Sequence, residues 1–204
     1  GSRGGPRDND GGRRGAGGGR SWQGGRAAGR GGGRARGSAH NMQLNRRILE
    51  CRSAEEVCQL VEAHGAELNH VNVATAYRRV LQSRRGGGPR GAVEGALREL
   101  EASAVRMMDA FEAREIANTL HAMAKARRRP GDRSLLPALE RRAEAVADTF
   151  NAQGVANTLW AYATLGRAPG AGLMRGLEGR AEAVADTFNA QEVANTLWAY
   201  ATLG

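Results

Sequence analysis

The sequence predicts an all-α protein, an α-solenoid of helix–turn–helix repeats of about 38 residues that follows a disordered Gly/Arg-rich tail. Residues 142–166, RAEAVADTFNAQGVANTLWAYATLG, recur at 180–204 with one change, Gly154 to Glu192. More divergent copies lie around Phe111 and, more weakly, around Leu68. Units of this size bury their apolar faces only against neighbouring units, and the stack presents one long surface. The pattern therefore favours a binding array over an enzyme.

Residues 1–40 are the predicted tail, which carries most of the positive charge. The chain of 204 residues has a net charge of +9, and residues 1–38 hold nine arginines against two aspartates. With Trp22 as its only aromatic residue, the tail has no apolar surface to offset the entropy of ordering. Such segments bind single-stranded RNA with little sequence preference, although a solvated linker is the alternative. The predicted RNA contacts in the tail are Arg3, Arg7, Arg13, Arg14, Arg20, Arg26, Arg30, Arg34 and Arg36.

Residues 41–85 are expected to form an N-terminal helical cap and the first repeat. An arginine-rich helix is predicted from Gln43 to Cys51. Ser53 opens a second helix, with Glu56 at the spacing of a capping box, and Gly65 ends it. A loop at 86–92 separates this part from the remaining array at 93–204, whose units centre on Phe111, Phe150 and Phe188 and which looks truncated at its C-terminus.

Each unit is predicted to consist of two antiparallel helices. In the third unit, helix A spans Leu135–Thr149, with a buried stripe that includes Leu136, while Glu140, Arg141, Arg142 and Glu144 face solvent. Asn151 is the expected N-cap of helix B. Phe150 and Val155 have the spacing of a hydrophobic staple. The same pair recurs as Phe188 with Val193, Phe111 with Ile116 and Leu68 with Val73, and Gly166 and Gly204 are expected to end helix B in the left-handed conformation.

Three sets of residues in the array are candidates for RNA contact. Asn118, Asn157 and Asn195 recur in the middle of helix B, either as an RNA-facing ladder or as buried amides bonded to the next unit's backbone. Arg127, Arg128 and Arg129 lie between two units, either as part of a basic edge that tracks phosphates or as a solvated loop. Trp160 and Trp198 either stack on RNA bases or pack between units, and His121 occupies their position in the second unit.

No pattern of catalytic residues, cofactor-binding motif or metal-binding motif is found. Cys51 and Cys58 lie seven residues apart and form neither a CxxC pair nor a zinc quartet, so reduced thiols are expected. Asp148 and Asp186 are equivalent repeat positions, not a carboxylate pair. No stretch reaches the roughly 18 to 20 apolar residues that a membrane span needs. The chain is therefore expected to be neither an enzyme nor a membrane protein.

The helix B pattern FNAQxVANTLWAYATLG resembles the octotricopeptide-like repeats of algal and protist organellar RNA factors, which are related to FAST-kinase-like proteins with a RAP domain. Residues 44–80, LNRRILECRSAEEVCQLVEAHGAELNHVNVATAYRRV, resemble the domain named after the sixth subunit of the kinetoplastid RNA-editing substrate-binding complex.

These resemblances imply an α-solenoid of the mitochondrion or chloroplast, with the mitochondrial matrix favoured. Its partner would be single-stranded RNA, and it would act in RNA processing, stability or translation. The residues up to Gly204 include no RAP domain, so the activity of that module is not expected here. The alternative is a scaffold that binds protein subunits of a ribonucleoprotein complex and contacts RNA only through the tail.

Overall fold

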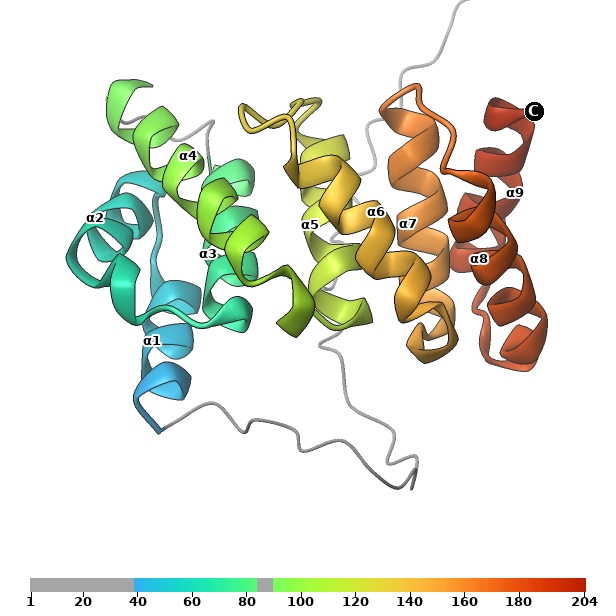
Figure 1. The fold of residues 1–204 in the computed structure, drawn as a ribbon, viewed down its shortest axis with the longest axis horizontal. Helices are drawn as coiled ribbons and strands as arrows, with labels where there is room; N and C mark the ends of the chain where they lie inside the picture. The colour runs from blue at the N-terminus through green and yellow to red at the C-terminus, as the bar shows by residue number, and fades with distance from the viewer. Residues whose placement is uncertain (1–38, 84–89) are drawn as a thin grey trace, which may run out of the picture. The chain divides into compact units, whose positions relative to one another are not determined.

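The computed structural model describes residues 39–83 and 90–204 (Figure 1). The nine tail arginines and the disorder predicted for residues 1–38 lie outside this part of the chain. The described residues form nine α-helices and no strand, which confirms the predicted all-α class. The helices are α1 Ala39–Glu50, α2 Ala54–His64, α3 His70–Ser83, α4 Arg90–Arg106, α5 Ala113–Lys125, α6 Leu135–Ala145, α7 Ala152–Thr164, α8 Ala171–Ala183 and α9 Ala190–Leu203.

The helices are arranged in two layers. In the first, α1 contacts α3, and contacts continue from α3 to α5, from α5 to α7 and from α7 to α9. In the second, α2 contacts α4, α4 contacts α6, and α6 contacts α8 (Figure 1). Helices next to each other in sequence join the layers, since α3 packs on α4, α5 on α6 and α7 on α8. This is the stacking of hairpins expected for a solenoid.

Helix boundaries differ from the prediction at three places. α1 starts at Ala39, four residues before the expected Gln43, and α4 starts at Arg90, inside the expected loop. The helix predicted over Leu135–Thr149 is divided, because α6 ends at Ala145 and Ala147–Thr149 form a 3-10 turn. The Val146 carbonyl accepts hydrogen bonds from both the amide and the hydroxyl of Thr149, at 2.9 and 2.7 Å, which closes this turn.

The predicted caps are present. Asn151 accepts a hydrogen bond from the Gly154 amide, and Asn189 forms a complete capping box with Glu192, which Gly154 cannot do. Ser53 accepts from the Glu56 amide at 3.1 Å. The Glu56 carboxylate, however, accepts from the amide of Arg52 rather than from that of Ser53. The local sequence therefore fixes where these helices begin.

Helix B ends in the left-handed conformation in two units. Gly166 has φ 65°, as predicted, and Arg127 has φ 48° at the equivalent position one unit earlier. In both cases the following amide bonds back to a carbonyl five residues earlier, Arg128 to Met123 and Arg167 to Tyr162, which is the hydrogen bond of a Schellman motif. Arginine thus occupies a conformation that suits glycine.

An arginine of each following unit bonds back to the preceding unit. One of these residues, Arg142, was expected to face solvent. Arg142 Nε donates to the carbonyl of Phe111 at 2.9 Å, and Arg180 Nε donates to that of Phe150 at 2.5 Å. Both phenylalanines are fully buried. The buried stripe of α6 also begins one residue earlier than predicted, because Leu135 is fully buried while Leu136 is half-buried.

Candidate nucleic-acid interface

One face of the first layer forms a regular surface, which we call the grid. Each of α3, α5, α7 and α9 contributes four residues at positions i, i+4, i+7 and i+11, a spacing that places them on one side of a helix. None of these residues is buried. The grid consists of Val71, Thr75, Arg78 and Gln82 on α3, Arg114, Asn118, His121 and Lys125 on α5, Gln153, Asn157, Trp160 and Thr164 on α7, and Gln191, Asn195, Trp198 and Thr202 on α9.

The grid contains no carboxylate, although the chain holds 21 aspartate and glutamate residues. Its cations, Arg78, Arg114 and Lys125, lie on α3 and α5. Burial lowers the pKa of His121, and the nearby charges of Lys125 and Arg78 lower it further. The pKa of Arg78 is also lowered, first by burial and then by Arg79 and Arg114. The α3–α5 half of the grid is therefore an electropositive surface.

Aromatic rings form a continuous row across the grid. The rings of His121 and Trp160 lie 5.1 Å apart between centroids, at 52°. Those of Trp160 and Trp198 lie 6.4 Å apart, at 38°. Packing between units is thus confirmed for both tryptophans. Trp198 is nevertheless 47% exposed, so part of the residue remains accessible to a ligand. Base stacking stays a prediction.

The asparagine row lies one helical turn from the aromatic row. Asn118, Asn157 and Asn195 are all half-buried. The Asn195 carbonyl oxygen accepts a hydrogen bond from Gln191 of the same helix at 2.9 Å. None of these three side chains is buried, and none is seen bonded to the backbone of another unit within the described residues. The amides therefore lie at the surface, and their contact with RNA stays a prediction.

The three arginines predicted between the second and third units differ in their surroundings. The Arg128 side chain is 12% exposed and pairs with Glu94 at 2.9 Å and Glu101 at 3.6 Å. Arg127 and Arg129 are exposed. Two carboxylates hold Arg128 within the array. Phosphate contact by the three arginines stays a prediction.

The pairing of Arg128 with Glu101 is one of two equivalent carboxylate clamps. In the next unit Glu140 accepts hydrogen bonds from Arg167 and from the Tyr162 hydroxyl, each at 3.2 Å. Burial raises the pKa of Tyr162, and the adjacent Glu140 charge raises it further. Glu140 was expected to face solvent. Glu101 and Glu140 lie 39 residues apart, and so do Arg128 and Arg167. This shared offset is the sequence signal that the two clamps are equivalent.

The sequence groups Arg78 with Arg79, Arg84 and Arg85 as a basic cluster that either tracks phosphates or is a solvated loop, but it does not align Arg78 with His121. The first unit lies 43 residues before the second, and this longer offset hides the correspondence between Arg78 and His121. The neighbouring Arg79 guanidinium donates to the Cys51 carbonyl and so ties α3 to the end of α1. Arg84 and Arg85, which the sequence grouped with them, lie outside the described residues.

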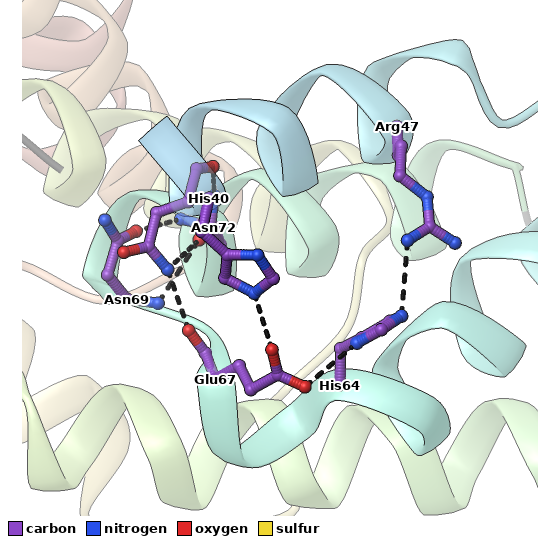
Figure 2. Close-up of polar contacts among 7 residues, drawn as sticks. His40, Arg47, His64, Glu67, Asn69 and Asn72 are labelled. Carbon is purple, nitrogen blue, oxygen red and sulfur yellow. Dashed lines mark hydrogen bonds and ion pairs between the residues drawn. The ribbon is translucent and has the colours of Figure 1, made fainter. Parts of the chain in front are cut away.

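A polar network fixes α1 against the first unit (Figure 2). His40 Nε2 lies 2.5 Å from one carboxylate oxygen of Glu67, and His64 Nδ1 lies 3.0 Å from the other. These two hydrogen bonds lower the pKa of Glu67. The Asn72 amide donates to the backbone carbonyl of Asn41 at 2.9 Å. The network therefore orients the N-terminal helix of the first layer.

Within 39–83 and 90–204, no group of three or more His, Cys, Asp or Glu side chains is placed to hold a metal ion. In the same ranges, no helix has both the length and the apolar character needed to cross a bilayer. Cys51 and Cys58 are both buried free thiols, as expected.

The two-layered array and its grid place the chain among the helical-repeat proteins of the α-solenoid class. Within that class, the family model of the RNA-editing substrate-binding complex 6 protein matches residues 97–204, just over half of the chain. The chain belongs to this family. A search of curated proteins found no match to the chain.

The matched residues correct the sequence-based assignment. The match covers the array from α4 to α9, whereas the resemblance to this family was expected at residues 44–80. The family pattern therefore resides in the repeats themselves. The likeness to octotricopeptide repeats stays a prediction.

Proposed function

We propose that the chain binds single-stranded RNA through the grid, as a subunit of an RNA-editing substrate-binding complex in the mitochondrion. The family match supports membership of such a complex. The observation that carries the proposal is a surface of sixteen residues without a carboxylate, cationic on α3–α5 and rich in aromatic and amide groups on α7–α9. In this proposal the chain is a binding protein, not an enzyme.

The chemistry of the grid suits unpaired bases. Aromatic side chains stack on bases of any sequence, amides bond the edges of unstacked bases, and cations contact phosphates. Helical-repeat proteins read about one base per repeat, a spacing that the rows of the grid would match. Acidic side chains would repel the backbone, and the grid has none. Within the complex, the chain would act in transcript processing, stability or translation, as octotricopeptide-like organellar factors do.

Charge reversal on the grid tests the proposal. Arg78→Glu with Lys125→Glu changes two grid cations, and Arg141→Glu with Arg175→Glu changes two exposed arginines of the other layer by the same net charge. Anisotropy of a labelled single-stranded RNA is measured for each variant over a range of salt concentrations. We expect only the grid variant to lose affinity for RNA. The slope of log affinity against log salt concentration should fall in magnitude by about 1.4, because each of the two lost phosphate contacts contributes about 0.7.

The rival function is a protein-binding scaffold that contacts RNA only through the tail. The near-neutral charge of the chain beyond residue 38 favours it. In that case the two double variants would bind RNA alike, and removal of residues 1–38 would abolish binding. Crosslinking gives an independent result, because adducts on helices of the array support the grid and adducts confined to residues before 39 support the scaffold.

A further inference from the structure

The grid residues of α7 and α9 are identical at every position. The grid residues of α5 differ, because Asn118 is shared while Arg114, His121 and Lys125 stand in place of Gln, Trp and Thr. Two neighbouring units therefore present the same four side chains, and the unit before them does not. The repeated set is Gln153, Asn157, Trp160 and Thr164 on α7 and Gln191, Asn195, Trp198 and Thr202 on α9.

The helices of the first layer also present these side chains in the same register. Trp160 and Trp198 are equivalent positions 38 residues apart, and their ring centroids lie 6.4 Å apart. His121 and Trp160 are equivalent positions of α5 and α7, and their ring centroids lie 5.1 Å apart. Equivalent positions of neighbouring helices therefore lie side by side. The grid surface of α9 is the grid surface of α7 moved along the array by one unit.

The one difference between the two repeats does not change the grid. Gly154 on α7 corresponds to Glu192 on α9. The Glu192 carboxylate accepts a hydrogen bond from the Asn189 amide at 3.0 Å, so it is held at the start of its own helix. Position 192 also lies about 100° around the helix from Gln191. The two surfaces therefore have the same chemistry.

Each of these two surfaces combines an aromatic ring with two amides. The Asn195 carbonyl oxygen accepts from Gln191 Nε2 at 2.9 Å, so the Asn195 N–H groups and the Gln191 carbonyl are left to bond a base. A tryptophan ring stacks on any base, whereas amide donors and acceptors bond the edge of a base and distinguish one base from another. Modular helical-repeat proteins read one base per unit with two or three such side chains. Identical side chains in the same register should therefore select the same base.

We propose that the RNA bound by this chain carries the same nucleotide twice in succession, at the two positions that contact α7 and α9. The inference rests on the proposed function of the grid. The neighbouring nucleotide, which contacts α5, is read by a different set of side chains and need not equal the other two. A doubled nucleotide reads the same in both directions, so the inference holds whichever way the strand runs along the array.

Selection from a library of random single-stranded RNAs tests the inference with the full chain, at about 0.15 M salt. The enriched sequences should share a motif in which two adjacent nucleotides are equal. Changing either nucleotide of the pair should weaken binding on the order of tenfold, as a mismatched base does in other specific sites. Anisotropy of labelled RNAs that differ at one position measures both effects.

Transfer of the α5 residues to one helix at a time shows which nucleotide each helix reads. The two triple variants add the same side chains and the same charge, so each is the control for the other. In the α7 variant, the equal nucleotides should move to the positions that contact α5 and α7. In the α9 variant, the positions that contact α5 and α9 should become equal. The α7 variant is Gln153→Arg, Trp160→His and Thr164→Lys, and the α9 variant is Gln191→Arg, Trp198→His and Thr202→Lys.

The outcomes separate this inference from the proposed function. RNA binding that is weakened by Arg78→Glu with Lys125→Glu, but that selects no equal pair, overturns the inference and leaves the proposed function intact. An equal pair that neither triple variant displaces also overturns it, because the pair would then be read elsewhere. RNA binding that is unaffected by the two charge reversals overturns both. Circular dichroism checks that the variants fold, and the selection by the unmodified chain decides even if the α7 variant, which alters the half-buried Trp160, does not.

Discussion

At the scale of single residues, the array departs from its own pattern at Arg127. The equivalent residue one unit later is Gly166, and both have a positive φ. A side chain in the left-handed region costs about 1 to 2 kcal/mol, because the Cβ atom approaches the following carbonyl. The Schellman hydrogen bond from Arg128 to Met123 holds this conformation in place despite the cost.

We therefore expect Arg127→Gly to stabilise the protein. The gain should be about 0.5 to 1 kcal/mol, because the greater entropy of glycine in the unfolded chain offsets part of the relieved strain. Thermal unfolding of the two proteins measures it. Arg129→Gly removes the same charge two residues away, where φ is not positive, and should give no gain. Equal gains in both variants would attribute the effect to charge rather than to φ.

At the scale of elements, α8 contains glycines in opposite surroundings. A Cβ atom on Gly176 would lie 2.8 Å from that of Ala147, where α8 packs against the 3-10 turn of the preceding unit. A Cβ atom on Gly179 would have no neighbour within 4 Å. The first glycine permits the close approach of two units, whereas the second only lowers helix propensity.

Alanine substitutions at these two positions should have opposite effects. Gly179→Ala should raise the free energy of unfolding by about 0.5 to 1 kcal/mol through helix propensity. Gly176→Ala should lower it by about 1 to 3 kcal/mol, because the added methyl group overpacks the contact with Ala147. Urea unfolding midpoints give both values. If Gly176→Ala stabilised the protein, the two units could move apart at this contact without a loss in the free energy of unfolding.

The helices and caps were predictable because their signals are local. Asn151 and Gly154, for example, lie three residues apart, and their hydrogen bond follows from the N-cap preference alone. The contacts between units were not predictable in this way. Arg142 bonds the Phe111 carbonyl across 31 residues and Arg128 pairs with Glu94 across 34, and an amphipathic pattern shows a polar position without showing its partner.

The grid was predicted in part. The asparagine row and the two tryptophans were evident from the 38-residue repeat, and Arg78 was not, because the first unit is out of register by four or five residues. Only the side-by-side packing of α3 and α5 brings Arg78 next to His121. Recognition of a surface in a solenoid therefore requires the structural register as well as the sequence period.

At the scale of the whole molecule, the stability of a solenoid is a sum of unit and interface terms. The α6–α7 unit has a neighbour on each side, whereas the outer face of α9 is open. We expect amides from Val193 to Leu203 to exchange with solvent much faster than those from Val155 to Leu165 in a dilute, monomeric sample. Hydrogen exchange followed by mass spectrometry resolves the two helices. Equal protection in a proven monomer would mean that the last unit needs no neighbour.

The arginine that reaches back to the preceding unit has a consequence for how the array grew. The near-identical stretches 142–166 and 180–204 begin at this arginine and lie 38 residues apart, so one 38-residue repeat contains both the arginine and the phenylalanine whose carbonyl the next arginine bonds. One stretch of coding sequence thus carries both halves of the contact. A tandem duplication of that stretch adds a unit whose interface is already complementary to its predecessor. The number of repeats can therefore change in a single genetic event, before selection has altered any side chain.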